Sequence, residues 1–476
     1  MERHSFQDGP LFLKKMKKHI FIPLGLLFFS LSLAAQQQFP GFRPLRYDED
    51  FSFLEHDTVK TAYKNIKYQP LSAKAATYIS YGGEVRLQYF NINNEGWGSE
   101  PHDQDGYVLS RYLLHADFHA GKRFRAFAQL QSSLADGTEN PGPVDQNPFE
   151  VHQAFVDYVP VHSDLSKLTF RIGRQELMYG SQRLVSVREN PNNRQSFDAA
   201  RIIWQHSDYK TEAFYSNYVQ AKAGIFNDKA LNTNTRFWGL YQSFSKVATL
   251  KNIDLYYFGL YHYQFKFSDV SGRETRHTLG LRNANSFGNF SYDMEAIYQF
   301  GKLGNSGISA WTASVEANYQ LKDILFKPVL CLRSEIVSGD ARQGDGKINN
   351  FNPMFPKGAY FGLASLIGPV NIVDVHPSVS LNFSSKLNLD LDYDIFWRHQ
   401  LQDGIYSVSS AAIYPYSSVS ERRHIGNQLT SALYYRSNPW LNFRAELTWF
   451  DAGKYLKDVG PGKDILIGGV TAQFRF

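Results

Sequence analysis

The sequence lacks most of the features that mark common protein classes. Cys331 is the single cysteine among 476 residues, which excludes an internal disulfide and any multi-cysteine metal site. Beyond residue 35 no apolar run approaches about 18 residues, so no transmembrane helix is expected there. Long amphipathic helical patterns are also absent. A disulfide-rich domain, a helical membrane protein and a helical bundle are therefore all disfavoured.

The N-terminal region has the pattern of a secretory signal peptide. Four lysines precede an apolar run over residues 20–33, and two small residues follow it (Lys14, Lys15, Lys17, Lys18; Ala34, Ala35). This order predicts export, with residues 1–35 removed. A membrane anchor is the alternative, but the run is shorter than the roughly 20 residues that a span needs. Met16 is an alternative start that gives a more compact signal.

Charge of one sign is not in excess once the signal is set aside. Residues 1–35 hold five of the 50 basic and two of the 45 acidic residues. The rest of the chain therefore carries 45 against 43, a net charge of +2. This balance gives no argument for nucleic-acid binding, and any electropositive feature must be local.

What the chain does have is aromatic residues and a strict alternation of residue types. Aromatics make up 15%, with 29 Tyr and 37 Phe against 7 Trp, and the mean hydropathy is −0.38. From about Ala76 onward, segments of ten or so residues alternate between apolar and polar. In Leu387–Arg398 every second residue from Leu387 is apolar, whereas the opposite face carries Asp390, Asp392, Asp394 and Arg398. Such a segment is typical of a strand with one apolar and one wet face.

These segments predict an all-β fold, a transmembrane antiparallel β-barrel of about 18 strands. Long polar breaks at residues 91–106, 136–150, 178–196, 340–358 and 402–421 predict extracellular loops, and short breaks such as 120–122 and 436–439 predict periplasmic turns. A soluble sandwich would also alternate. Densely charged polar faces and aromatics at strand ends, as at Trp397 and Trp449, favour the barrel. Residues 76–476 would form it, with residues 36–75 as a periplasmic leader segment.

Arginine is concentrated in residues 171–201. The segment holds six arginines and three acids (Arg171, Arg174, Arg183, Arg188, Arg194, Arg201; Glu176, Glu189, Asp198). An arginine on the lipid face at mid-membrane costs about 2–4 kcal/mol, so Arg171 and Arg201 are expected to face the lumen. Arg174 has the opposite parity, which predicts a bulge near Gly173 or an exit from the membrane there.

On these residues and motifs, the chain resembles the alginate export family of bacterial outer-membrane barrels. The longest matching motif is RIGRQELMYGSQRLVSVRENPNNRQSFDAAR at residues 171–201. Others are LRYDEDFSFL (45–54), GGEVR (82–86), SGD (338–340), FNPMFP (351–356), FWRHQLQDGIY (396–406) and HIGNQLTSALYYRSNPWLNFRAELTWFDAG (424–453). The resemblance implies an eighteen-stranded monomeric barrel in a Gram-negative outer membrane. The terminal Phe476 resembles the signal that the barrel assembly machinery reads.

The resemblance also implies a polysaccharide exit duct with an electropositive constriction. Residues 178–196 would fold into the bore, and inward arginines would attract a polyuronate. The matching positions are Arg86, Arg111, Arg171, Arg174, Arg183, Arg188, Arg194, Arg201 and Arg398, with Asp198 and Asp392 holding some of them in place. The expected partners are an acidic polysaccharide or small anionic solute and outer-membrane lipid, with no cofactor.

Other functions stay open at this point. An uptake porin for small anions or oligosaccharides would use the same residues. The aspartates at 390, 392 and 394 would then set up a transverse field, or they serve as partners of basic residues on adjacent strands. A structural or adhesive barrel with its pore closed by loops is the third possibility. A TonB-dependent receptor is disfavoured, because no plug of the needed length precedes the strands.

Enzyme signals in the sequence are weak. His115 and His119 share a strand face, but no carboxylate-plus-histidine set completes a metal site. The Ser–His pair that an outer-membrane lipase would place on its lipid-facing wall is missing. The acidic, Gly-rich stretch at residues 340–347 suggests a calcium loop, but its spacing does not match an EF-hand. We therefore predict a channel with no enzyme activity and a flexible external loop at 340–347.

Overall fold

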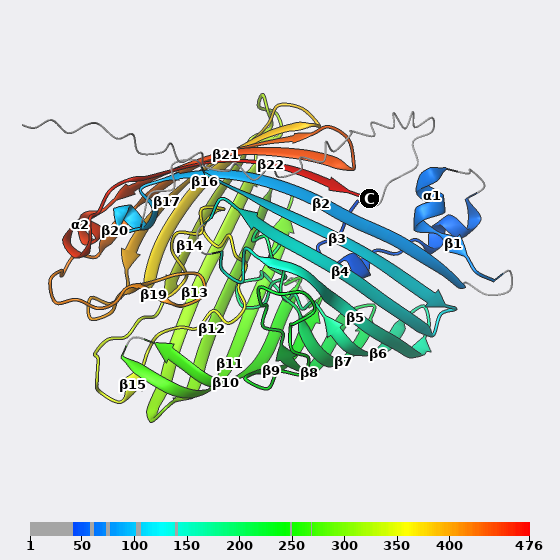
Figure 1. Cartoon of the computed structure of the whole chain (residues 1–476), viewed down its shortest axis with the longest axis horizontal. Helices are drawn as coiled ribbons and strands as arrows, with labels where there is room; N and C mark the ends of the chain where they lie inside the picture. Colours follow the sequence, from blue (N-terminus) through cyan, green and yellow to red (C-terminus); the bar gives the residue numbers. More distant parts are fainter. Residues whose placement is uncertain are drawn as a thin grey trace, which may run out of the picture. The chain divides into compact units, whose positions relative to one another are not determined.

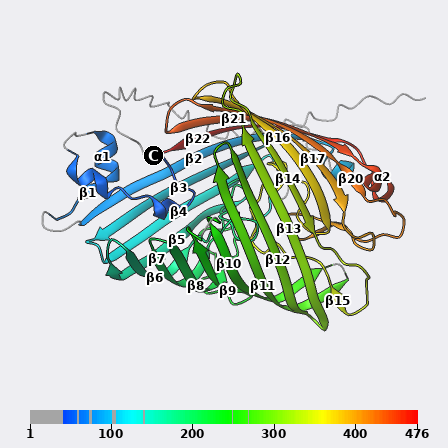
Figure 2. The ribbon, with the colours of Figure 1, turned by 180° about the vertical axis from the view of Figure 1, so that it is seen from behind.

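The computed structural model describes residues 41–57, 61–72, 77–100, 106–138, 141–247, 250–267 and 269–476. The predicted signal peptide, residues 1–35, lies outside these residues. Figures 1 and 2 show the described chain from two opposite sides as a wall of long antiparallel strands. Only short helices accompany the strands, and no helix in the described part is long and apolar enough to cross a membrane.

The fold is a closed antiparallel barrel of 18 strands. Each strand pairs with the next along the chain, and the last strand, β22, pairs with the first, β2, in the register Glu84↔Arg475. This confirms the predicted fold class. The strands are β2 (Thr77–Asn93), β3 (Tyr107–Ala120), β4 (Phe124–Asp136), β5 (Asn147–His162), β6 (Ser166–Gln175), β7 (Phe197–His206), β8 (Tyr209–Tyr218), β9 (Thr235–Phe244), β10 (Ile253–Phe267), β11 (Val270–Phe287), β12 (Phe290–Leu303), β13 (Ser306–Gln320), β14 (Val329–Val337), β16 (Ile372–Asn382), β17 (Leu387–Arg398), β20 (His424–Arg436), β21 (Leu441–Ala452) and β22 (Ile465–Arg475).

The remaining elements are short and decorate the two rims. They are the 3-10 helices Arg46–Asp48, Ser52–His56 and Glu95–Gly98, the helices α1 (Ala62–Lys67) and α2 (Lys454–Val459), and the strands β1 (Gln69–Pro70), β15 (Lys347–Ile348), β18 (Ile405–Tyr406) and β19 (Ala412–Tyr414). Turns at one rim are short, for example residues 121–123 between β3 and β4. The other rim carries long loops, among them 176–196, 338–371 and 399–423. By this asymmetry the short-turn rim is periplasmic.

The strands have an apolar outer face and a polar inner face, as the alternation predicts. Leu114 and Ile172 on the outer face are 53% and 63% exposed, whereas Arg111 and Arg171 on the inner face are 0% and 6% exposed. Lipid would cover the first pair, and the second pair is enclosed by the barrel.

Two long loops fold into the barrel and meet there. Residues Val185 and Phe355, one from each loop, form a parallel bridge. The Ser186 amide donates to the Phe355 carbonyl, and the Phe355 amide donates to the Leu184 carbonyl, both at 2.9 Å. Aromatic wall residues pack against this junction, with Phe197 at 4.9 Å and Phe237 at 5.1 Å between ring centroids. The loops therefore share an apolar core inside the barrel.

Part of the predicted leader segment also lies inside the barrel. Tyr47 is 3% exposed, its ring packs on the inward Phe127 and Phe155, and its hydroxyl donates to the Glu176 carbonyl at 2.8 Å. The 3-10 turn at Arg46–Asp48 is therefore held between the wall and the start of the inward loop. Figure 1 shows this blue segment leading from α1 into the barrel.

We expect Leu114→Arg to lower the free energy of unfolding by about 2–4 kcal/mol, because it places a charge in the middle of the lipid-facing wall. Phe124→Arg, at the start of β4 beside a periplasmic turn, should cost only about 0–1 kcal/mol. Urea titration of the barrel in lipid vesicles measures both values. Equal losses at the two positions would contradict the assignment of the outer face.

Candidate functional site

Two arginines face one another across neighbouring strands of the inner wall. Arg171 of β6 is the register partner of Arg201 of β7, an arrangement that is destabilising unless each charge is compensated. Arg171 donates to both oxygens of Asp157, at 2.7 and 2.8 Å. Arg201 makes an ion pair with Glu212 of β8. Both arginines point inward, as predicted, and each is paired with a different acidic residue.

Aromatic rings complete the surroundings of Arg171. Its guanidinium carbon lies 4.2 Å from the Tyr47 ring centroid and 4.0 Å from that of Phe155. These cation–π contacts cover the faces of the guanidinium that the carboxylate leaves free. Arg171 is 6% exposed, so this arginine anchors the leader segment and offers little charge to a passing solute.

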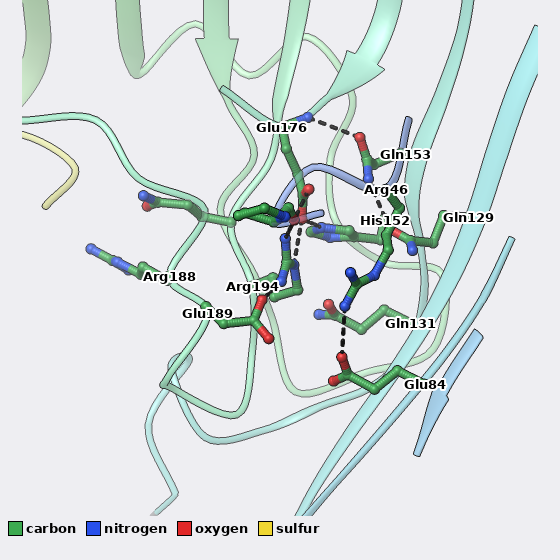
Figure 3. Close-up of polar contacts among 12 residues, drawn as sticks. Arg46, Glu84, Gln129, Gln131, His152, Gln153, Glu176, Arg188, Glu189 and Arg194 are labelled. Atoms are coloured by element: carbon green, nitrogen blue, oxygen red, sulfur yellow. Dashed lines mark hydrogen bonds and ion pairs between the residues drawn. The ribbon is translucent and has the colours of Figure 1, made fainter. Parts of the chain in front are cut away.

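A second group, which we call the constriction cluster, surrounds the inward loop. It consists of Arg46, Arg86, Arg111, Arg188, Arg194 and Arg475 with Glu49, Glu84, Glu176 and Glu189. Six arginines against four glutamates give a formal net charge of +2. Figure 3 shows five of these side chains between the wall and the loop, namely Arg46, Glu84, Glu176, Glu189 and Arg194.

Glu84 and Glu189 bind the wall arginines of this cluster. Arg111 donates to Glu84 from Nε at 2.8 Å and to Glu189 at 3.1 Å. Arg475 reaches the same two carboxylates at 3.2 and 3.0 Å. Arg86 instead donates to the carbonyl oxygens of Glu189 and Pro191, at 2.7 and 2.8 Å. The loop is therefore tied to β2, β3 and β22, beside the seam that closes the barrel.

Arg194 and Glu176 fasten the two ends of the loop to each other. Arg194 donates to both Glu176 oxygens, at 2.5 and 3.0 Å, and to the Pro44 carbonyl at 2.8 Å. A ring nitrogen of His152 lies 2.8 Å from Glu176 Oε1. Figure 3 shows Arg194 and His152 converging on Glu176. Both charged groups are buried, so this pair is a structural lock.

Arg188 differs from the other members of the cluster. Within the described part of the chain, no hydrogen bond or ion pair reaches its guanidinium, and the side chain is half-buried. Its φ of 55° lies in the left-handed region, which is uncommon for a residue with a side chain. In Figure 3 the side chain points away from Arg194 and Glu176. Arg188 is thus a cation whose charge is not cancelled by a contact.

Arg183 lies in a different and more acidic part of the interior. It donates to Glu335 at 2.9 Å and to the Tyr360 hydroxyl at 3.2 Å, and its Nε is 3.3 Å from Glu295. Two carboxylates against one guanidinium leave this group negative. Arg183 therefore joins the loop to the far wall without adding positive charge to the bore.

The structure does not bring Arg174 and Asp198 to the bore. They are register partners joined at 2.9 Å. Continuous pairing of β6 with β7 from Ser166 to Gln175 contradicts a bulge near Gly173, and the other predicted alternative, an exit from the membrane there, stays a prediction. Their parity is that of the exposed Ile172. Loop 219–234 covers them, since Arg174 donates to the Asp228 carbonyl at 3.4 Å and Asp198 accepts from the Leu231 amide at 2.8 Å. The charges tie this loop to the outer wall.

Arg398 and Asp392 are inward but separate from the constriction cluster. Arg398 is fully buried at the outer end of β17, where it donates to the carbonyls of Ser420, Arg422, Leu401 and Asp403. Its guanidinium stacks on Tyr455 at 4.0 Å. Asp392 lies 2.8 Å from His376. The partner of this aspartate is thus a histidine of the adjacent strand, and Arg398 is an anchor for loop 399–423.

Several residues of the interior were not among those predicted. They are Arg46, Tyr47, Glu84, Glu212 and Arg475. Tyr47, Glu84 and Glu212 contact predicted arginines, whereas Arg46 and Arg475 pair with Glu84, the acid that also binds Arg111. The spacing of Glu84 and Arg86, two apart on one strand face, is a signal that could have identified the first acid. His115 and His119 take other roles: His115 stacks on Phe127 and His119 on Tyr78.

Two acidic residues meet where loops 338–371 and 399–423 contact each other. The Asp340 amide donates to Asp403 Oδ2 at 2.8 Å, and the Tyr406 hydroxyl donates to Asp403 Oδ1 at 2.6 Å. Burial, followed by the charge of Asp403, raises the pKa of Asp340 to about 7. Burial raises the pKa of Asp403 to about 6, although its hydrogen bonds act in the opposite direction. Both carboxyls therefore keep their protons to a higher pH than exposed aspartates do.

A cavity of about 540 Å³ opens near the periplasmic rim. It is lined by turn residues after β7 and β9, by Lys210 and Arg282, and by Gly180 of the inward loop. Asp254 and Asp293 pair with Arg282 at 2.8 and 2.6 Å. The inward loop thus extends from the constriction cluster to the edge of a vestibule on the short-turn side.

Comparison with known families gives a match to the model described as alginate export, over residues 77–464. A search of curated proteins found no match.

Solved porins are similar in fold. OccD3 (OpdP) of Pseudomonas aeruginosa is 12% identical with a TM-score of 0.56, covering 86% of this chain and 93% of that one. A BenF-like porin from Pseudomonas fluorescens Pf-5 is 8% identical with a TM-score of 0.54, covering 84% and 98%. Pseudomonas aeruginosa OccK2 (OpdF), solved in complex with glucuronate, is 10% identical with a TM-score of 0.51, covering 84% and 96%. These similarities establish the fold alone.

We expect the contact between loops 338–371 and 399–423, at Asp340 and Asp403, to loosen as pH rises. Because the folded-state pKa values of Asp340 and Asp403 are raised above the usual value of about 3.9, their contribution to loop closure is complete below that value and is lost as pH rises through about 6 to 7. Single-channel recording should show a higher open probability at about pH 8 than at about pH 5. Asp340→Asn should flatten this dependence, whereas Glu421→Gln, at an exposed position of loop 399–423, should retain it. An unchanged pH profile in Asp340→Asn would refute the link.

Proposed function

Because the chain belongs to the alginate export family, an outer-membrane channel family, we propose that it conducts a hydrophilic anionic solute. The solute class that fits best is an acidic polysaccharide passing outward, as in alginate export. The observation that carries the proposal is the constriction cluster, with its formal net charge of +2 and the uncompensated Arg188.

The local charge of the cluster favours an anionic solute, although the chain beyond residue 35 is nearly neutral as a whole. Low-dielectric walls focus the field of a small charge excess into the water between them. Most arginines of the cluster are held by glutamates, so they fix the geometry of the loop. Arg188, whose guanidinium forms no hydrogen bond or ion pair with the described residues, then supplies a donor fork that matches a carboxylate in a bidentate manner.

A uronate polymer suits this arrangement better than a small inorganic anion does. Each sugar unit carries one carboxylate. As the polymer moves, each carboxylate binds the guanidinium and is then replaced there by the carboxylate of the next unit. Arginine binds carboxylate with directional hydrogen bonds, and hydroxyl groups of the sugar can accept from further donors. This reasoning concerns the chemical class and does not select one polysaccharide.

An uptake porin for small anions or oligosaccharides is the second candidate, favoured by the similarity of the fold to the porins described above. A passive channel has no built-in direction, so the same residues serve either. We also propose that the protein is a monomer and that Phe476, hydrogen-bonded through its backbone to Gly83 at 3.0 and 3.1 Å, presents the terminal signal to the assembly machinery.

Two variants of adjacent residues test the role of the charge excess. Arg188→Gln should lower the permeability ratio of chloride over potassium, and Glu189→Gln should raise it, by about twofold or more in each case, because the cluster charge changes to +1 and +3. Reversal potentials in planar bilayers with a salt gradient measure the ratio. Lys246→Gln in the exposed β9–β10 turn is the control and should leave it unchanged. If both cluster variants retain the wild-type ratio, the charged constriction is not the selective element.

Blocking experiments then separate the substrate classes. Polyuronate should block the current of the wild-type channel, and a neutral glycan of equal length should not. Block by both polymers to the same extent would favour the uptake porin for oligosaccharides over export of an acidic polysaccharide.

A further inference from the structure

Three buried side chains with metal-binding groups meet on the inner wall, away from the constriction cluster. Asp374 and His376 lie on β16, and Asp394 lies on β17. One possible ligand atom of each residue lies within 4.8 Å of those of the other two. The exposed fractions are 0%, 4% and 1%. Neither function proposed above uses this cluster.

Asp374 is the member whose environment demands an explanation. Within the described part of the chain, no hydrogen bond reaches either of its carboxylate oxygens. Its register partner Glu335 is also a carboxylate, which accepts from Arg183, Tyr360 and Thr312 and therefore has no donor for Asp374. A buried carboxylate without a partner is strongly unfavourable. A bound cation would remove this cost.

Neighbouring side chains orient His376 and Asp394 toward the cluster, in the way that metal ligands are oriented in proteins. His376 Nε2 lies 2.8 Å from Asp392 Oδ1, and Nδ1 faces Asp394. When Nε2 carries the hydrogen and donates it to Asp392, the lone pair of Nδ1 is directed toward the cluster. Metal-bound histidines commonly give their second ring N–H to a carboxylate in this way.

Asp394 is oriented by a donor of its own. The Gln428 side chain donates to Asp394 Oδ2 at 3.1 Å and to the Phe361 carbonyl at 2.6 Å. Asp394 Oδ1 is therefore the oxygen left facing His376. Phe361 belongs to the inward loop 338–371, so the orientation of this carboxylate depends on that loop being in place.

We propose that Asp374, His376 and Asp394 bind a divalent transition-metal ion of the Zn²⁺ type in the barrel wall. One imidazole nitrogen and two carboxylates suit such an ion better than Mg²⁺ or Ca²⁺, which prefer oxygen donors alone. Three protein ligands leave further positions for water or for a carboxylate of a solute. Asp392, whose side chain is 30% exposed, marks the side from which an ion enters.

Metal binding would change the charge of this wall. The two aspartates carry a formal charge of −2 when both are ionised, as metal ligands are. A divalent ion would cancel that charge, so that this side would not repel an anionic solute. This consequence rests on the proposed function, whereas the binding of the ion does not. The two are therefore measured separately.

The direct test is titration of the full-length barrel, purified in detergent without a polyhistidine tag, with Zn²⁺ in a calorimeter. We expect one ion per chain. Asp374→Asn and His376→Gln should each weaken binding at least tenfold, and Asp392→Asn, which keeps all three ligands, by about 10- to 100-fold. His277→Gln, which removes a histidine that contacts Tyr257, is the matched control and should bind as the wild type does.

Heat-modifiable gel migration reports whether each variant is folded. Asp374→Asn should fold, because it removes a buried charge that has no partner. Absence of a stoichiometric Zn²⁺ site in the wild type, or wild-type affinity in folded Asp374→Asn, would overturn the proposal. Reversal potentials with and without Zn²⁺ then address the charge effect. Binding without a change in selectivity would leave the metal site standing and count against the anion channel.

Discussion

The interior of this barrel is organised by the need to compensate buried guanidinium groups. Arginine keeps its charge under all ordinary conditions, and several arginines of the wall and of the inward loop lie where water is scarce. Arg111, Arg194 and Arg276 are each less than 4% exposed. A buried charge is tolerated only when it is paired and hydrogen-bonded. The position of the inward loop 176–196 follows from the pairing of its acids Glu176 and Glu189 with two of these arginines.

Some of these acids are local and others are supplied by the loops. Asp157 and Glu212 come from the strand next to their arginine, so those pairs stabilise the wall by themselves. Glu176 and Glu189 belong to the inward loop and pair with arginines of the wall or of the same loop. Removing the loop would leave Arg111 with Glu84 as its single carboxylate. The loop is thus part of the electrostatic structure of the barrel as well as an obstruction in it.

The strands and their faces could be predicted from the sequence, because a two-residue period is a local property. The orientation of Arg171 and Arg201 followed from it. The partners of the charges could not be predicted, since they depend on register and on loops that are distant in sequence. Arg174 looks like its neighbours in the motif, yet it lies on the outer face, because parity continues through Gly173 without a bulge. Arg398 faces inward, as its parity predicts. It lies at the end of β17, however, where the carbonyls of loop 399–423 surround it.

The two inward loops divide the interior into sides of unlike chemistry. Phe355 packs on Phe197 and Phe237, and backbone bonds hold its loop to residues 184–186, so this side is apolar and closed. Separating it would expose aromatic surface at about 25 cal/mol per Å² and would offer a hydrated anion no partner in return. The opposite side, along β2, β3 and β22, holds the arginines that tie down the inward loop, among them the fully buried Arg111. Under the proposed function an anionic solute would pass along the seam that closes the barrel, next to Arg188, whose guanidinium forms no hydrogen bond or ion pair within the described part of the chain.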